Sequence, residues 1–486
     1  MPQEPGSAKR CCSTCSKCCC ACFFVLIVLL AGVTFTSVYL GIKLIKDNKS
    51  LTKAKTQLTE KNEKMKKSLD TVACAQQFEV KLNDYGYHDI IDVVTVPGKG
   101  YVTLLDAYPI LEEKMIDEKN NSVLWTRQQP SKDSGATLLV SRDGSQILSM
   151  MMKRENDEGA VKLNVTVVEA QTGALVHSQV FAARQGYRAM ELGKHEYAVI
   201  YAETSEREYY ENLFAVKIDS EGKISWNVSI GEHYAYGMVQ VSGSEKLEAA
   251  AVTYKTTDPT TAHYFFLGSS GVLSRVDLPN TVTLPLVEEP DSGMFLTATY
   301  SGRADEPSHE GHKVQVIEFD PRMSGAYSIL AYVNVFIRRL IVSTDTYLIT
   351  RVKDSLYSVT LNGFNDYSKA QCVGLVFDRN TKSVNTTYGY SPLDDSHPSQ
   401  VKPTANGNLL YLGTTDITQV DLQGKVLWQQ TITKYRSNGW VFPTKNDFAY
   451  LYFGKFANEN NQYDEYTGAR IVYPWERVDQ IHKCSP

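Results

Sequence analysis

Seven cysteines lie within twelve residues near the N-terminus and are the densest group of reactive side chains in the chain. They directly precede or enter an apolar segment, and they are Cys11, Cys12, Cys15, Cys18, Cys19, Cys20 and Cys22. Cysteines beside a membrane segment are sites of S-acylation. The spacing of Cys12, Cys15 and Cys18 also matches zinc ligands, but zinc needs a structured module and only a short tail is available. We therefore expect lipidation at these residues.

Other groupings of reactive residues are weaker. His309 and His312 follow Asp305 and Glu306, but this segment is rich in Gly, Pro and Ser and is typical of an exposed loop. Ser141-Arg-Asp143-Gly144 resembles the start of a sialidase Asp box, yet the Trp that completes such a box is absent, so we predict an ordinary turn. The G-x-S-x-G elbow of hydrolases is absent as well. The sequence predicts no catalytic residue, no metal site and no cofactor.

Two aromatic and acidic clusters are better candidates for a binding surface. Tyr209 and Tyr210 lie in EREYYEN (206–212), and Tyr234 and Tyr236 lie in GEHYAYG (231–237). Tyrosine is enriched at protein interfaces, because it joins a rigid apolar ring to a polar hydroxyl. These four residues form the predicted partner surface for a protein or glycan ligand. The alternative is ordinary packing within a sheet.

The apolar segment, residues 20–42, contains 23 residues without a charge and is long enough to cross a bilayer as a helix. It is too long for a signal peptide, so we predict an uncleaved anchor in membrane lipid, with residues 1–19 as a cytoplasmic tail. The nine lysines between Lys43 and Lys67 argue for the opposite orientation.

Two features outweigh this lysine count, and the first is the cysteine group. The second is the set of Asn-x-Ser/Thr sequons, which are glycosylated only outside the cytoplasm: Asn48, Asn120, Asn164, Asn227 and Asn385. We expect a type II glycoprotein of the plasma membrane or secretory pathway, with its head extracellular or lumenal.

Residues 43–72 are rich in lysine and lack Gly and Pro, which predicts a helical stalk. Leu44, Leu51, Leu58 and Met65 recur every seven residues, as in a coiled coil that would form a homodimer or trimer. Lys61 interrupts the seam, so a monomeric helical spacer remains the alternative.

The head, residues 73–486, carries about twelve net negative charges, whereas residues 1–70 carry about seven net positive charges. An acidic head argues against a nucleic-acid partner, because phosphate binding needs a positive surface. Short alternating runs of Val, Tyr, Thr and Leu between Gly, Asn and Asp predict an all-β fold of antiparallel strands.

The head also repeats itself. Residues 213–230 (LFAVKIDSEGKISWNVSI) and 415–432 (TDITQVDLQGKVLWQQTI) share an Asp, a Gly-Lys turn and a Trp. Weaker copies place turns at Asn121, Gly173, Gly271, Gly325, Lys382 and Gly468, mostly about 50 residues apart. A hairpin repeat of this length predicts a β-propeller.

The Asp, Gly-Lys and Trp pattern resembles the blade repeat of quinoprotein-like (PQQ-type) propellers, in which the Trp packs between adjacent blades. The resemblance implies a propeller, and the eight turns favour eight blades over seven. The head does not obviously supply the residues with which quinoprotein dehydrogenases hold their cofactor. Residues 78–84 (FEVKLND) are the candidate strand that closes the ring. Closure would bring Cys74 and Cys484 together, and we predict a disulfide there, or a link between protomers through Cys74.

The leading functional hypothesis is a binding module: a receptor, adhesin or scaffold outside the cytoplasm. A lumenal enzyme with residues spread over the channel mouth is one alternative. A constitutive subunit of a larger membrane complex is the other.

Overall fold

The structure, a computed structural model, describes most of the chain from residue 79 to residue 472. The described residues are 43, 46, 48, 49, 52, 53, 55, 56, 79–83, 89–107, 110–119, 122–130, 136–154, 161–205, 209–234, 239–255, 261–278, 281–283, 286–301, 312–323, 326–335, 339–341, 349–364, 370–390, 400–413, 416–431, 439–443, 450–458 and 461–472. The chain separates into two compact units, Met1–Gln76 with Cys484–Pro486, and Gln77–Lys483.

In the first unit, the described residues between 43 and 56 have helical backbone and are exposed. The Thr52 hydroxyl donates a hydrogen bond to the Asn48 carbonyl (2.7 Å), one helical turn earlier. The predicted anchor, the cysteines of residues 11–22, the heptad positions, Cys74 and Cys484 lie outside the described residues. Among the residues that are described, no helix combines the length and the apolar character needed to cross a membrane.

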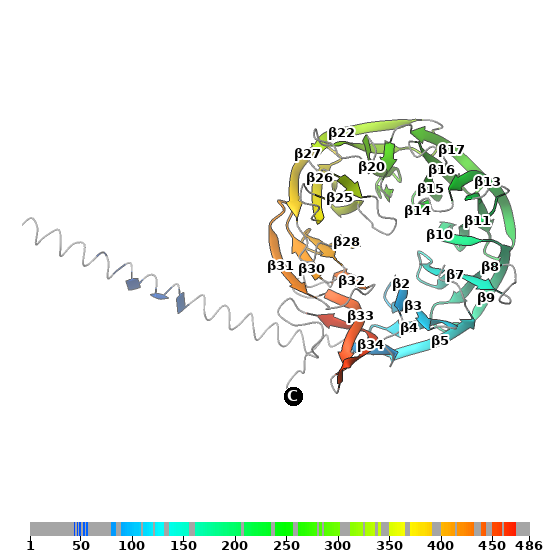
Figure 1. Ribbon diagram of the computed structural model, residues 1–486, viewed down its shortest axis with the longest axis horizontal. Coiled ribbons are helices and arrows are strands. Elements are labelled where there is room, and N and C mark those ends of the chain that lie inside the picture. The colour runs from blue at the N-terminus through cyan, green and yellow to red at the C-terminus, as the bar shows by residue number, and fades with distance from the viewer. Residues whose placement is uncertain are drawn as a thin grey trace, which may run out of the picture. The chain divides into compact units, whose positions relative to one another are not determined.

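The second unit is an eight-bladed β-propeller, as the sequence predicts (Figure 1). Each blade is an antiparallel sheet, and we number the blades by their order in the chain and name their strands from the axis outward.

The first four blades are β2 (Asp89–Val96), β3 (Gly100–Ala107), β4 (Ile110–Asp117) and β5 (Ser122–Pro130); β6 (Ala136–Val140), β7 (Gln146–Arg154), β8 (Val161–Glu169) and β9 (Leu175–Ala182); β10 (Gln185–Gly193), β11 (Glu196–Thr204), β12 (Tyr210–Ile218) and β13 (Ile224–Tyr234); and β14 (Val239–Ser244), β15 (Ala249–Lys255), β16 (Ala262–Gly268) and β17 (Gly271–Leu278).

In blades 5 and 6 the innermost strand is divided into two short strands that pair with the same neighbour. These blades are β18 (Thr281–Thr283), β19 (Val287–Glu288), β20 (Phe295–Ser301), β21 (His312–Phe319) and β22 (Tyr327–Val335); and β23 (Arg339–Ile341), β24 (Ile349–Lys353), β25 (Leu356–Phe364), β26 (Ala370–Asp378) and β27 (Ser383–Tyr390). Blade 7 is β28 (Gln400–Pro403), β29 (Leu409–Leu412), β30 (Asp416–Val420) and β31 (Val426–Thr431).

Blade 8 closes the ring with a strand from the start of the head. Its order is β32 (Trp440–Pro443), β33 (Tyr450–Asn458), β34 (Asn461–Val472) and, outermost, β1 (Glu79–Asn83). The predicted closing strand is therefore confirmed. The predicted turn at Gly468 is wrong, because Gly468 lies inside β34 between Gly454 and Lys81. A ring closed in this way has seven outer hairpins, since the eighth outer strand comes from elsewhere in the chain.

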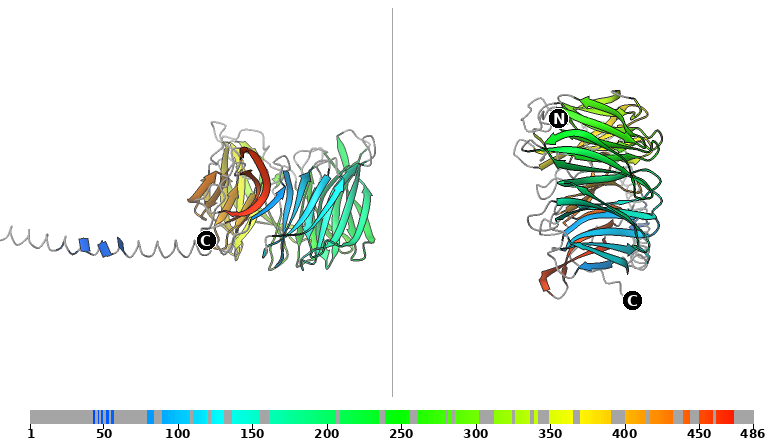
Figure 2. Two further views of the ribbon diagram at one scale, coloured as in Figure 1. Left: turned by 90° about the horizontal axis from the view of Figure 1, so that it is seen from below. Right: turned by 90° about the vertical axis from the view of Figure 1, so that its right-hand side faces the viewer.

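Because consecutive strands run antiparallel, the connections lie on two opposite faces of the ring (Figure 2). The turn face carries the connections from the first to the second and from the third to the fourth strand of each blade. The loop face carries the connections from the second to the third strand and from one blade to the next.

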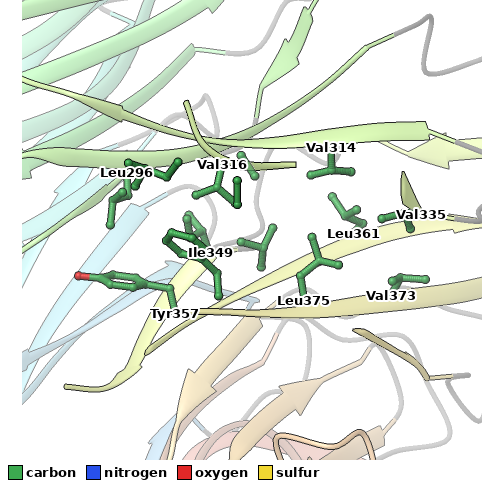
Figure 3. Close-up of a cluster of buried hydrophobic side chains, with 14 residues drawn as sticks. Leu296, Val314, Val316, Val335, Ile349, Tyr357, Leu361, Val373 and Leu375 are labelled. Atoms are coloured by element: carbon green, nitrogen blue, oxygen red, sulfur yellow. The ribbon is translucent and has the colours of Figure 1, made fainter. Parts of the chain in front are cut away.

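The apolar core is divided among the blades. The described residues form eight buried clusters, and each lies between two neighbouring blades. Between blades 5 and 6, for example, Leu296, Val316 and Val335 meet Tyr357 and Leu375 (Figure 3). Alternate positions along a strand point to opposite faces of its sheet, so each inner sheet contributes to two clusters. Burial of this apolar surface is the main stabilising contribution to the ring.

The two best sequence copies form the same turn. The Asp219 carboxylate accepts hydrogen bonds from the backbone N–H groups of Glu221 (3.0 Å) and Lys223 (2.8 Å). Asp421 accepts from the corresponding Gln423 (2.9 Å) and Lys425 (2.8 Å). Gly222 and Gly424 both have a φ of 83°, a conformation that glycine adopts without strain. The shared Asp and Gly are thus explained by turn geometry.

The tryptophans of the repeat pack between blades, as the resemblance implies. Trp125 donates from its ring N–H to the Ala170 carbonyl of the next blade (2.9 Å), and Trp226 donates to the Ser269 carbonyl (2.9 Å). Trp428 stacks on Tyr450 of blade 8, with ring centroids 5.5 Å apart.

Candidate functional site

The predicted tyrosines lie at the loop-face end of blade 3. Tyr209 directly precedes β12, Tyr210 begins it, and Tyr234 ends β13 as the direct cross-strand neighbour of Tyr210. We call Tyr209, Tyr210 and Tyr234 the tyrosine edge. Tyr236 and the side chain of Tyr234 lie outside what the structure describes. The structure therefore brings three of the four predicted residues together in the backbone.

Tyr209 has an unusual backbone conformation. Its side chain is 52% exposed and its φ is 68°. The other described non-glycine residues with positive φ lie in short turns on the turn face: His195, Glu248, Asp354 and Lys382. For a bulky residue this conformation costs about 1–2 kcal/mol, and such strain is common at functional sites. The backbone conformation therefore lowers the stability of the fold while it holds an exposed aromatic ring at this position.

A buried polar network lies next to the tyrosine edge. Glu211 and His233 are cross-strand neighbours, and they are only 2% and 0% exposed. Glu211 Oε2 accepts a hydrogen bond from the Tyr187 hydroxyl (3.2 Å) and lies 3.3 Å from His233 Nε2. His233 Nε2 also lies 3.0 Å from the Tyr187 hydroxyl. Arg184 Nε contacts Glu211 Oε1 at 3.2 Å. Three strands of blade 3 and the connection before β10 are thereby joined beneath the tyrosine edge.

Within this network the Tyr187 phenol stays protonated. Burial raises the pKa of the Tyr187 phenol well above its usual range, and the negative charge of Glu211 adds to the effect. The phenol therefore remains a neutral donor to Glu211. Because Glu211 and His233 are almost fully buried, they support the edge and do not themselves contact a ligand.

Blade 4 locks onto the outer strand of blade 3 just below the tyrosine edge. The Tyr254 hydroxyl donates to the Ile230 carbonyl (3.0 Å), and burial raises the pKa of this phenol to about 12. A Cβ atom at Gly231 would lie only 2.7 Å from the Tyr254 hydroxyl, and Gly231 has a φ of 140°. Glycine is therefore required where the two blades approach each other. Within blade 3, the Ser205 hydroxyl donates a hydrogen bond to Glu232 Oε1 (2.9 Å).

Blade 4 adds charged side chains. Asp277 accepts from Arg275 Nε (2.8 Å) and lies 2.8 Å from His263 Nδ1. Although partial burial opposes it, these hydrogen bonds hold the pKa of Asp277 below its usual range. Arg275 lies over the Phe265 ring, 5.1 Å from its centroid. Arg275 and Asp277 are 47% and 44% exposed, so this end of blades 3 and 4 presents Tyr and Arg, the residue types that dominate binding energy at interfaces.

A second charged group lies on the innermost strands. Asp92 of β2, Arg188 of β10 and Lys402 of β28 interact electrostatically although their blades are not neighbours in the ring. The Asp92 carboxylate accepts from the Leu138 N–H of the next blade (2.9 Å), and burial raises its pKa. Burial also lowers the pKa of Lys402, whose ammonium lies 5.3 Å from the Phe442 ring centroid.

The predicted turn at Ser141–Gly144 is confirmed and connects β6 to β7. Asp143, Ser145 and His195 meet there in a combination that resembles a catalytic triad. However, His195 Nε2 lies 3.0 Å from both the Ser145 hydroxyl and Asp143 Oδ2. A triad needs one ring nitrogen for the nucleophile and the other for the carboxylate. This arrangement therefore links the turns of blades 2 and 3 and does not activate the serine.

The histidine pair of the sequence does not form a described site. His309 lies outside the described residues, and His312 begins β21. Within the described ranges, no group of three His, Cys, Asp or Glu residues could hold a metal ion. Cys372 is buried on β26, and burial raises its thiol pKa far above the usual range, so this thiol is unreactive.

The sequons differ in their surroundings. Asn227 and Asn385 are exposed on the outermost strands β13 and β27, and Asn48 is exposed as well. Asn164 is half-buried on β8, and its side-chain amide donates to Gln129 Oε1 of blade 1 (3.0 Å). Asn120 lies outside the described residues. Glycosylation at all five remains a prediction.

The supporting network lies in the very segments that the sequence singled out. Glu211 follows Tyr210, and His233 precedes Tyr234. Alternation along a strand puts such neighbours on opposite faces of the sheet, so one set is buried when the other faces outward. That rule could have identified Glu211 and His233. The sequence gives no signal for Tyr187 and Arg184, which lie more than twenty residues earlier.

No protein-family model and no curated protein matches the sequence. The C-terminal WD40 domain of Sif2 has 8% identity and a TM-score of 0.50, and the match covers 81% of this chain and 99% of that domain. The WD40 domain of SCAP from fission yeast has 9% identity and a TM-score of 0.46, with coverage of 83% and 96%.

Quinohemoprotein alcohol dehydrogenase from Comamonas testosteroni has 11% identity and a TM-score of 0.47, with coverage of 85% and 78%. The solved structures similar to this chain thus include WD40 and quinoprotein-type propellers. At 8% identity the likeness to the Sif2 domain shows the fold alone, and the strand topology makes the head an all-β, eight-bladed propeller.

Proposed function

We propose that the propeller is a binding module whose tyrosine edge engages a protein ligand. The observation that carries this proposal is Tyr209, an exposed aromatic ring held in a strained backbone conformation next to the buried pair of Glu211 and His233. A rigid aromatic side chain loses little entropy on binding, so preorganisation of this kind raises affinity. A glycan ligand would use the same surface, because sugar rings also stack on tyrosine.

The test is a matched pair of tyrosine variants in the full chain. Tyr332 of β22 is 54% exposed and lies at the outer strand of blade 5, so it is a control of equal exposure on another blade. A panel of extracellular proteins and glycans is screened against the natural chain, and each binder is then titrated against Tyr209→Ser and Tyr332→Ser.

We expect Tyr209→Ser to weaken binding by roughly tenfold or more, as is usual for a central interface residue. Tyr332→Ser should leave the affinity within about twofold. Equal effects of the two substitutions on every binder would reject the tyrosine edge as the binding surface.

We also propose that the chain is a type II, single-pass membrane glycoprotein with its head outside the cytoplasm and its N-terminal cysteines lipidated. The uncharged segment 20–42, the cysteines beside it and the sequons support this topology. Self-association through the stalk and the Cys74–Cys484 disulfide belong to the same proposal, because the disulfide needs an oxidising compartment.

Protease protection on intact cells, combined with glycosidase treatment, tests the topology. Asn227→Gln and Asn385→Gln should each remove one glycan, because both asparagines are exposed. Asn164→Gln is the informative contrast, since its amide is bonded to blade 1. A head that is unglycosylated and protected from protease at the surface and in the lumen would refute the proposed orientation.

A second candidate function is binding or turnover of a small molecule at the channel. It is favoured by Asp92, Arg188 and Lys402, whose charges interact across the ring and whose acid and amine have pKa values shifted toward neutrality. Lys402→Met is the decisive variant, because it removes the amine but keeps an apolar stem beside Phe442. A ligand lost in Lys402→Met and retained in Tyr209→Ser would place the function in the channel.

A further inference from the structure

We infer that the contact between blades 2 and 3 is a proton-sensitive joint of the ring and that His177 is the group that titrates there. The inference does not depend on the proposed ligand, because it concerns how one blade is held against the next. It rests on a comparison of the same position in several blades.

This position lies on the outermost strand, immediately after a β-bulge that disrupts the ladder. Trp125, His177, Trp226 and Ser274 all occupy it, opposite Met115, Val167, Lys217 and Phe266 respectively. Trp125, Trp226 and Ser274 donate a hydrogen bond to the turn of the following blade. The acceptors are the carbonyls of Ala170 (2.9 Å), Ser269 (2.9 Å) and Pro321 (2.8 Å). In blades 1, 3 and 4 this hydrogen bond therefore joins a blade to the next one. In blades 5 to 7 the position holds Ala331, Thr386 and Trp428, and Trp428 bonds to Gln419 of its own blade.

At blade 2 the residue in this position makes no such hydrogen bond among the described residues. His177 packs against the turn of blade 3 so closely that a Cβ atom at Gly222 would lie 2.7 Å from its Cβ and Cγ atoms. Both ring nitrogens are shielded from solvent, and neither has a hydrogen-bond partner among the described residues. A buried donor without an acceptor typically costs about 1–3 kcal/mol. The side-chain amide of Gln179 does donate a hydrogen bond to the Gly222 carbonyl of blade 3 (2.6 Å).

The charges around His177 are few. Asp219, at the start of the blade 3 turn, is the one that acts on it, and its carboxylate is already engaged by backbone N–H groups. In the same turn Glu221 and Lys223 pair with each other at 2.7 Å. Lys217 of β12 pairs with Glu196 at 2.9 Å.

Blade 2 offers little more. On β8 the residue opposite His177 is Val167, and Glu169 at the end of that strand accepts from the Thr172 hydroxyl (2.9 Å). The sequence of β9 itself, LVHSQVFA, contains no carboxylate and no lysine or arginine. Among the described residues, a second proton on His177 would therefore find no acceptor and only one opposing charge nearby.

The direction of the pH effect follows from burial. Burial lowers the pKa of His177 below its ordinary value of 6.5, and the charge of Asp219 only partly opposes this. The unfolded chain then binds the proton more tightly than the folded chain. The stability that depends on a neutral His177 is present above about pH 6.5 and is lost as the pH falls below that value.

The experiment compares the full natural chain with His177→Phe and His177→Trp. Phe keeps an aromatic ring that does not titrate, and Trp adds the N–H that blades 1 and 3 use. The midpoint of thermal unfolding is measured at about pH 7.5 and about pH 5.5, on either side of histidine titration. We expect the downward shift on acidification to be larger in the natural chain than in either variant. Equal shifts in all three chains would overturn the inference.

Hydrogen exchange gives a local measurement that does not require a variant to fold. Peptides covering residues 170–182 and 217–226 report on the joint between blades 2 and 3. A second set of peptides, covering 118–130, reports on the Trp125 joint and serves as the internal control. After correction for intrinsic exchange, acidification should reduce protection in the first set and not in the second. Unchanged protection at both joints would contradict the inference.

Discussion

The two ends of the third blade differ in how far their features recur in other blades. At the turn face, Asp219, Gly222 and Lys223 form a turn whose hydrogen bonds reappear around Asp421 and Gly424 in blade 7. At the loop face, Tyr209 is the one described non-glycine residue with a positive φ. The network of Glu211, His233, Tyr187 and Arg184 beside it is more extensive than the His263–Asp277 pair at the corresponding position of blade 4.

Features that recur from blade to blade are those that every blade requires, namely a tight turn and close packing against the neighbouring blade. Features that occur in a single blade are not required by the architecture. A costly feature of that kind, such as the strained backbone of the exposed Tyr209, needs another explanation, and ligand binding provides one.

Removing the central carboxylate of the loop-face network should have the largest effect. Glu211→Ala leaves Arg184, the Tyr187 hydroxyl and His233 Nε2 without their shared acceptor in a buried site. Loss of the acceptor of a buried donor costs about 1–3 kcal/mol, and the Tyr187 hydroxyl and His233 Nε2 both lose theirs, so chemical denaturation should show the largest loss of the series. Glu221→Gln removes an exposed ion pair with Lys223 and should leave the unfolding free energy unchanged. Similar losses in both variants would show that the network does not stabilise blade 3.

A turn-face glycine should have an intermediate effect. Gly222→Ala places a Cβ atom 2.7 Å from His177 in a backbone with a φ of 83°, so both strain and a clash oppose it. Gly98→Ala is the matched control, because Gly98 has a φ of 68° but open space around its Cβ position. We expect a loss of about 1 kcal/mol at Gly98 and about 2–4 kcal/mol at Gly222, measured by denaturation. Equal losses would mean that backbone strain alone makes glycine necessary there.

The smallest effect should come from the blade-to-blade hydrogen bond. Trp226→Phe keeps most of the apolar contact but removes the N–H that Ser269 accepts (2.9 Å), which should cost about 1 kcal/mol. Trp428→Phe is the contrast, since its ring N–H bonds to Gln419 of its own blade. Hydrogen exchange in residues 262–274 should rise in the first variant and stay unchanged in the second. A rise in both would indicate a general loss of stability.

Most of the architecture could be predicted because the blades repeat short-range chemistry. Asp219, Gly222 and Trp226 recur as Asp421, Gly424 and Trp428, and each has a local reason in a turn, a positive φ or a neighbouring blade. The closing strand followed from the need to complete the last sheet. The predicted turn at Gly468 is wrong because Gly468 lies within β34, the third strand of its blade. A Gly near an acidic residue has the same local pattern in a strand as in a turn.

The candidate site was only half predictable. Tyr209 and Tyr210 were found because aromatic residues cluster in the sequence, and the structure places them beside Tyr234. Tyr187 could not be found in this way, because its contact with Glu211 spans 24 residues and is created by the pairing of four strands. The missing hydrogen bond at His177 was equally hidden, since it becomes visible only when equivalent positions of several blades are compared in space.

The closing strand also decides how the ring responds to force. β1 is held by its ladder with β34, from Glu79 opposite Arg470 to Asn83 opposite Thr467, and it is the first strand of the head. Tension on the chain ahead of residue 79 therefore enters the ring through a five-residue strand at its seam. Detaching β1 would expose the edge of β34 and open blade 8 before any other blade is loaded. The force that the propeller withstands when pulled from this side is then set by the unfolding rate of this one short ladder, and not by the stability of the whole ring.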